Sequence, residues 1–172
     1  MTDQAGGAAE GLPEEALSLF ETALDNFYTL KDIRGLTTEQ MEGIYALAYN
    51  LYDQSLYEEA HNIFTFLCLY DHLETKYWLA LGACRQMLKR YQAAIDAFSM
   101  AALLDEENPA VPLHAAECYL ALDNLDGAEQ GAEAARWLAE KHSGHDAVSD
   151  RAGVILNYLQ DKKASAAAGG QG

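Results

Sequence analysis

The chain has 172 residues, enough for one compact domain or a short array of repeats, and a formal net charge of -16. Its 27 acidic side chains against 11 basic ones disfavour binding to nucleic acids and to anionic lipid surfaces. No segment has the roughly 18 consecutive apolar residues of a membrane span, and no secretory signal is found, so we expect a cytoplasmic protein without direct membrane contact.

The two ends of the chain lack periodic apolar residues. Residues 1–11 and 164–172 are rich in Ala, Gly and Gln and predict disordered tails. Residues 12–163 are therefore expected to form a single domain. Its first element is an amphipathic helix that starts at Pro13 and carries an apolar stripe from Ala16 to Tyr28. This helix either caps one end of the domain or packs on a second copy of the protein.

The middle of the chain repeats with a period of 34 residues. Small residues recur at two phases of this period: Ala48, Gly82 and Ala116 at one, and Ala60, Ala94 and Ala128 at the other. This period and pattern are typical of tetratricopeptide repeats, in which pairs of antiparallel helices stack. A small residue on the first helix lets its partner approach closely, and a small residue on the second helix admits the next pair.

The repeats give the expected fold class, an all-α right-handed solenoid of three tetratricopeptide repeats with flanking N- and C-terminal helices. The repeats are expected at about 41–74, 75–108 and 109–142, with helices at 38–53, 57–69, 74–88, 91–104, 109–121 and 125–140. Thr37 and Gln40 fit a capping box at the first of these helices. A helix at about 147–162 should cap the last repeat, whose apolar face would otherwise be exposed.

The sequence contains no motif of a known catalytic or nucleotide-binding site. We therefore expect no enzymatic activity, no cofactor and no metal. His114 and Cys118 have the i, i+4 spacing of helical metal ligands, but Cys118 lies 34 residues after Cys84, which indicates a packing position. The cysteines are expected to be reduced thiols in the core.

In a stack of this kind, the first helix of each repeat lines a concave groove. The expected groove residues are Tyr45, Tyr49 and Tyr52 in the first repeat, Lys76, Leu79, Ala83 and Gln86 in the second, and Leu113 and Glu117 in the third. The three tyrosines either pack against the first helix of the chain or form a platform for an extended peptide, for which tyrosine offers a large apolar area with a polar tip. Only Lys76 is basic, so the groove suits apolar side chains better than a carboxylate.

Two segments carry a family resemblance. The run YALAYNLYDQSLYEEAHNIFTFLCLYDHLETKYWLALGACRQ, which begins at Tyr45, and the run PAVPLHAAECYLALDNLDGAE, which begins at Pro109, resemble the class II, or translocator, chaperones of bacterial type III secretion, the LcrH/SycD-like group. The similarity covers about residues 30–140. The turn residues Ser55 and Asp123 depart from that family, where glycine is frequent.

The resemblance implies a function. It implies a bacterial cytoplasmic chaperone that binds hydrophobic translocator proteins, two in most members, through an extended segment held in the groove. The chaperone would keep them soluble and secretion-competent. It also implies groove contacts for Tyr70 and His72 and a homodimer formed through the N-terminal helix. The alternative is an adaptor in a secretion or regulatory complex without chaperone activity.

Overall fold

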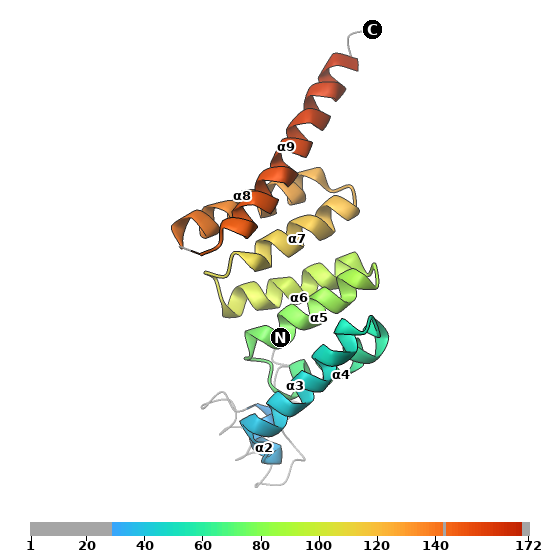
Figure 1. Ribbon diagram of the computed structural model, residues 1–172, viewed down its shortest axis with the longest axis vertical. Coiled ribbons are helices and arrows are strands. Elements are labelled where there is room, and N and C mark those ends of the chain that lie inside the picture. Colours follow the sequence, from blue (N-terminus) through green and yellow to red (C-terminus); the bar gives the residue numbers. More distant parts are fainter. Residues whose placement is uncertain (1–28, 143, 170–172) are drawn as a thin grey trace, which may run out of the picture.

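The computed structural model describes residues 29–142 and 144–169, and all regular secondary structure within these residues is helical. The helices stack along one long axis, with α2 near one end and α9 projecting from the other (Figure 1). Their bounds are α2 Leu30–Arg34, α3 Thr38–Asp53, α4 Tyr57–Tyr70, α5 Thr75–Met87, α6 Tyr91–Leu104, α7 Ala110–Ala121, α8 Leu125–Lys141 and α9 Asp146–Gly169.

The six helices from α3 to α8 form the three expected pairs, and their ends lie within a residue of the predicted ones. The expected all-α repeat fold is therefore confirmed. The capping box before α3 is also confirmed: Gln40 N donates to Thr37 Oγ1 at 3.2 Å, and Thr37 N donates to Gln40 Oε1 at 2.9 Å. These bonds satisfy backbone groups that the first helical turn leaves without partners.

The small residues occupy the close contacts that the sequence pattern predicts. Ala48 and Ala116 are fully buried, and Gly82 is buried as well. A Cβ atom on Gly82 would lie 2.7 Å from Cδ1 and 2.8 Å from Cζ of Phe98 on the partner helix α6. Any side chain at position 82 would therefore push the two helices of the second repeat apart.

The turns inside the three repeats share one backbone feature. Ser55, Lys89 and Asp123 have φ angles of 62°, 60° and 55°, in the left-handed region that glycine adopts most easily. The three residues are 34 positions apart, so the left-handed backbone recurs at the same position of every repeat. An L-residue is strained there by about 1 kcal/mol.

The helix α2 joins the array through a shielded ion pair. Lys31 Nζ lies 2.6 Å from Asp71 Oδ2 after the end of α4, and the two side chains are only 19% and 11% exposed. The hydrogen bond that Lys31 donates to the Asp71 carboxylate raises the pKa of Lys31. Thr29 has an extended backbone and caps α2, so α2 is not a continuation of the helix predicted to start at Pro13. The rest of that predicted helix lies outside the described residues.

The last helix is longer than predicted. It packs Ala152, Ile155 and Leu159 against alanines of α8, including Ala128 and Ala132, as a capping helix should. It then continues to Gly169, so residues 164–169, expected as part of a disordered tail, are helical. The alanines that suggested low complexity are also the strongest helix formers.

All three cysteines of the chain lie within the described residues. Cys68, Cys84 and Cys118 are buried free thiols, as expected. Burial raises the pKa of Cys68 and of Cys84 to about 12 and that of Cys118 to about 11. Within 29–142 and 144–169, no three His, Cys, Asp or Glu side chains are grouped as a metal site requires. In the same ranges, no helix combines the length and the apolar character of a membrane span.

Candidate functional site

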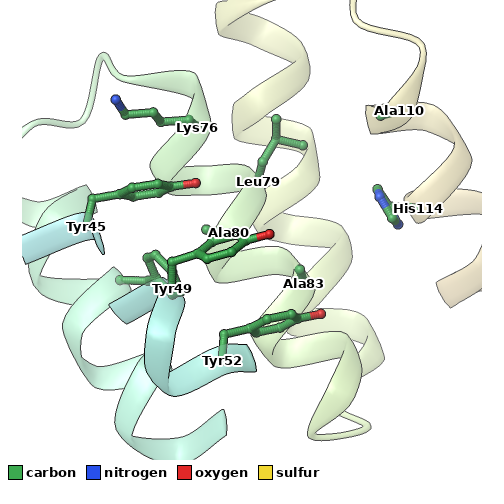
Figure 2. A pocket seen from close by; sticks show the side chains of 10 residues that line it. Tyr45, Tyr49, Tyr52, Lys76, Leu79, Ala80, Ala83, Ala110 and His114 are labelled. Atoms are coloured by element: carbon green, nitrogen blue, oxygen red, sulfur yellow. The ribbon is translucent and has the colours of Figure 1, made fainter. Parts of the chain in front are cut away.

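The first helices of the three repeats enclose a hollow of about 330 Å³ (Figure 2). Tyr45, Tyr49 and Tyr52 on α3 form one side, and Figure 2 shows their rings pointing across it. The remaining lining residues are Phe64 on α4, Lys76, Leu79, Ala80 and Ala83 on α5, and Ala110 and His114 on α7. We call this site the tyrosine hollow.

The three tyrosines share one face of α3 because their spacing of four and three residues matches the helical repeat. Their rings form a continuous series, with centroids 6.2 Å apart for Tyr45 and Tyr49 and 6.4 Å apart for Tyr49 and Tyr52. Tyr45 also contacts buried Phe64 edge to face at 5.6 Å. Tyr49 is 49% exposed, whereas Tyr45 and Tyr52 are half-buried. The packed rings thus hold an exposed aromatic wall in a fixed position.

The chemistry of this wall is neutral. Burial raises the pKa of Tyr45 and that of Tyr52, so both phenols keep their protons at physiological pH. Each ring offers an apolar surface and a hydroxyl that can donate or accept a hydrogen bond. Such a surface can bury an apolar side chain and bond the polar backbone beside it.

Lys76 is the one lysine or arginine among the residues that line the tyrosine hollow. It forms an ion pair with Glu42, which lies one repeat earlier on α3. Its Nζ atom also lies 5.2 Å from the ring centroid of Tyr45, within the range of a cation–π contact. Because the charge already has partners within the chain, the hollow is poorly suited to binding a free carboxylate.

A polar cluster follows the tyrosine hollow on α5, α7 and α9. Glu117 accepts a 3.0 Å hydrogen bond from Gln86 Nε2 and pairs with Arg151, and His114 Nδ1 lies 3.4 Å away. Burial acts to raise the pKa of Glu117, but His114, Gln86 and Arg151 outweigh it and hold the pKa at about 2. We call Gln86, His114, Glu117 and Arg151 the polar cluster.

Most of the predicted groove residues meet on this face. Tyr45, Tyr49, Tyr52, Lys76, Leu79 and Ala83 line the tyrosine hollow, and Gln86 and Glu117 belong to the polar cluster. Leu113 does not reach the surface: it is 1% exposed and packs in a cluster with Ile155 and Leu156 of α9. The groove prediction is therefore wrong for Leu113, because α9 covers that position.

Tyr70 and His72 lie apart from the tyrosine hollow. His72 lines a second hollow, of about 530 Å³, with Leu30, Ile33 and Trp78 among its neighbours. Tyr70, at the end of α4, stacks on Phe66 with ring centroids 4.2 Å apart. Tyr70 ends the second helix of the first repeat and His72 follows that helix, whereas the tyrosine hollow is built mainly from first helices.

His114 and Arg151 are among the residues of this face that the sequence analysis did not predict. His114 stacks on Phe98, with ring centroids 5.4 Å apart, and borders the tyrosine hollow from α7. Arg151 reaches the polar cluster from α9, which was expected only to cap the array. For Arg151 the sequence does contain an indication of its ion pair. Arg151 follows Glu117 by 34 residues, the same interval that separates Lys76 from Glu42.

Comparison with known proteins identifies the repeats and the relatives. The model of the tetratricopeptide repeat family matches residues 41–72 and 75–108. The low calcium response locus protein H of Yersinia pestis is 34% identical over 148 residues, which cover 84% of this chain and 88% of the relative.

Solved structures agree with this similarity. A T3SS complex from Aeromonas hydrophila has a chain that superposes with a TM-score of 0.82 at 39% identity, covering 85% of this chain and 97% of that one. PcrH in complex with the chaperone binding region of PopD superposes with a TM-score of 0.73 at 43% identity, covering 75% and 97%. PcrH has also been solved with the chaperone binding region of PopB; the TM-score is 0.69 at 45% identity, covering 71% and 98%.

Proposed function

Since this chain belongs to the class II, or translocator, chaperones of bacterial type III secretion, we propose that it holds hydrophobic translocator proteins in the cytoplasm before their secretion. The observation that carries the proposal is the tyrosine hollow, an exposed aromatic wall on the face formed by the first helices. An extended segment of a translocator lies across this face and places apolar side chains against Tyr45, Tyr49 and Tyr52.

The activity is binding, not catalysis. Each Leu, Ile or Phe side chain buried in the tyrosine hollow contributes about 1.5–3 kcal/mol before the cost of ordering the client segment is subtracted. Small Ala80 and Ala83 leave room opposite the rings for such side chains. Binding through a few side chains of an extended segment is reversible, as a chaperone that releases its client for secretion requires.

One chaperone serves two translocators in this proposal. The structures of PcrH with regions of PopD and of PopB support it, since one chaperone accepts both. The two clients of this chain then use the same tyrosine hollow and compete for it. An adaptor that binds folded partners is less consistent with the site, because an apolar hollow of about 330 Å³ fits single side chains.

The proposal also includes self-association through the segment that starts at Pro13. It rests on the family resemblance, because that segment lies outside the described residues. Comparing the mass in solution of the full chain with that of a chain starting at Thr29 tests it independently of client binding. The proposal is supported if the full chain is a dimer and the truncated chain is a monomer. It is contradicted if both chains have the same oligomeric state.

The test of the groove is co-expression with the translocators of the same secretion system. Tyr45→Ala combined with Tyr49→Ala removes most of the aromatic wall, so the translocators should become insoluble and should no longer co-purify. Trp137→Ala is the matched control, because this ring is 62% exposed on α8 and does not line the tyrosine hollow. Unchanged solubility and co-purification of the translocators with the double variant would exclude the groove.

A further inference from the structure

The helix α9 occupies the place of a fourth first helix. It packs on α8 and also touches α7, just as α7 packs on α6 and also touches α5. Its core residue Ala152 follows Cys84 and Cys118 at intervals of one repeat, and all three side chains are fully buried. The structural repeat therefore continues into α9, beyond the residues that the sequence period revealed.

Within the described residues, this fourth repeat has a first helix and no second one. Ala48, Gly82 and Ala116 are buried because each receives the second helix of its own repeat. The next position in this series is Asp150, which is exposed. An aspartate is tolerated there because the described residues supply no second helix to cover it.

The ion pair between Arg151 and Glu117 identifies the side of α9 that faces the groove. It joins residues one repeat apart on successive first helices, as the pair of Lys76 and Glu42 does beside the tyrosine hollow. Val154 and Tyr158 follow Arg151 by three and seven residues and therefore lie on the same face of α9. Val154 continues the series Tyr52, Gln86 and Leu120 at intervals of one repeat.

This face of α9 is apolar and open. Val154 is 69% exposed and Tyr158 is 50% exposed, although α9 has a well-packed opposite face that includes Ile155 and Leu159. Half-buried Leu120 on α7 lies at the position equivalent to Val154 one repeat earlier. We call Leu120, Val154 and Tyr158 the α9 patch.

We propose that the α9 patch is a second binding site for the same client segment that occupies the tyrosine hollow. This inference rests on the proposed function and adds that the client segment carries a second apolar group. The occupant is the continuation of the extended translocator segment, and it places a further apolar side chain against Val154 and Tyr158. The α9 patch continues the face of the tyrosine hollow, because the first helices α3, α5, α7 and α9 follow one another in contact. The polar cluster separates the two apolar parts of this face.

The geometry predicts the pattern of the client segment. Packed helices lie about 8–10 Å apart, so α5 and α9, two steps apart in the series, are separated by roughly 20 Å. An extended chain advances about 3.3 Å per residue, so about six residues cover this distance. The client segment therefore carries an apolar group for the tyrosine hollow, polar residues beside Glu117 and His114, and a second apolar group about six residues away.

The test uses synthetic peptides that tile the translocators of the same secretion system. The tightest-binding peptide is shortened from each end in turn, and its affinity is measured by calorimetry. The variant is Val154→Ser combined with Tyr158→Ser, whose exposed positions leave the core intact. Leu103→Ser is the matched control, because Leu103 is 75% exposed on the second helix α6.

The double variant should bind the full peptide about tenfold more weakly, or more, whereas the control variant binds it like the wild type. The peptide shortened by the second apolar group should bind the wild type and the double variant equally. Equal affinity of both proteins for the full peptide overturns the inference. So does a double variant that loses only self-association, because the α9 patch would then bind a second copy.

Two further measurements separate binding at the tyrosine hollow from binding at the α9 patch. Tyr45→Ala with Tyr49→Ala should abolish binding of the full and the shortened peptides. If it does not, the proposed function fails at the tyrosine hollow, independently of the outcome at α9. Replacing Tyr158 by a photo-crosslinking phenylalanine should link α9 to the second apolar group of the bound peptide, and a peptide that links elsewhere or not at all contradicts the inference.

Discussion

The first and third repeats place different side chains on the same backbone positions. On α3 the groove face carries Tyr45, Tyr49 and Tyr52, whereas the equivalent residues of α7 are Leu113, Glu117 and Leu120. The tyrosines form an open aromatic wall. Leu113 is buried under α9, and Glu117 is held in a polar cluster. The repeat therefore sets where a side chain lies, while the neighbouring helix decides whether that side chain is open to a client.

The hydrophobic core also differs between the two ends of the array. Around the first repeat it is built from large side chains, with Phe64, Tyr77 and Met41 among the largest. Around the third repeat and α9 it is built largely from alanines, including Ala128, Ala132 and Ala135. Large residues hold the tyrosine wall rigid from behind, whereas small residues let α9 approach closely and cover Leu113.

The largest change in unfolding free energy is expected at Gly82, where a small residue contacts the large ring of Phe98. Gly82→Ala forces a methyl group into the ring of buried Phe98, which stacks on His114 at the edge of the tyrosine hollow. The variant should lose about 2–3 kcal/mol of unfolding free energy in urea. Gly43→Ala is the control, because nothing lies within 4 Å of a Cβ there, and it should gain up to about 1 kcal/mol. Equal stabilities of the two variants would refute the close-contact explanation.

The ion pairs of the two regions should differ in strength. Lys31→Met leaves Asp71 without its partner in a site that is 11% exposed, and should cost about 2 kcal/mol of unfolding free energy. Lys141→Met breaks the pair with Glu107, whose side chains are 46% and 66% exposed, and should cost less than about 0.5 kcal/mol. Thermal unfolding of both variants measures the two losses of unfolding free energy. Similar losses would contradict the expected difference between the shielded and the exposed ion pair.

The polar cluster around Glu117 should make part of the protein's stability sensitive to acid. The pKa of Glu117 is lowered from 4.5 to about 2, so its contribution is complete above pH 4.5 and is lost as the pH falls towards 2. After allowance for solvent screening, it amounts to about 1–2 kcal/mol. Urea unfolding from pH 7 to pH 2.5 should show the wild type converging on Glu117→Gln, and a gap that does not change with pH would disprove this role.

A small gain in unfolding free energy is expected in the turns, whose backbone geometry is the same in all three repeats. Lys89 has a left-handed backbone and an exposed side chain, so Lys89→Gly should stabilise the protein by about 0.5–1 kcal/mol. Lys89→Ala is the control, because alanine keeps the strain. Stability curves in urea distinguish the two variants, and a glycine variant no more stable than the alanine variant would show that the turn is unstrained.

Much of this arrangement could be predicted from the sequence because a period of 34 fixes the register of every repeat. The ends of α3 to α8 and the common face of Tyr45, Tyr49 and Tyr52 follow from that register. The period fades in α9, where Asp150 replaces the small residue, so neither the burial of Leu113 nor the role of Arg151 was foreseen. The ion pair of Lys31 with Asp71 joins residues 40 positions apart, outside any repeat interval.

The proposed function requires that a client segment lies in the tyrosine hollow. Its most direct test replaces Tyr49 by a photo-crosslinking phenylalanine in the chaperone co-expressed with its translocators, with Trp137 replaced in the same way for comparison. The account predicts that the residue at position 49 links to a short translocator segment and that the residue at position 137 does not. A link at position 137 alone, or equal linking at both positions, would contradict it.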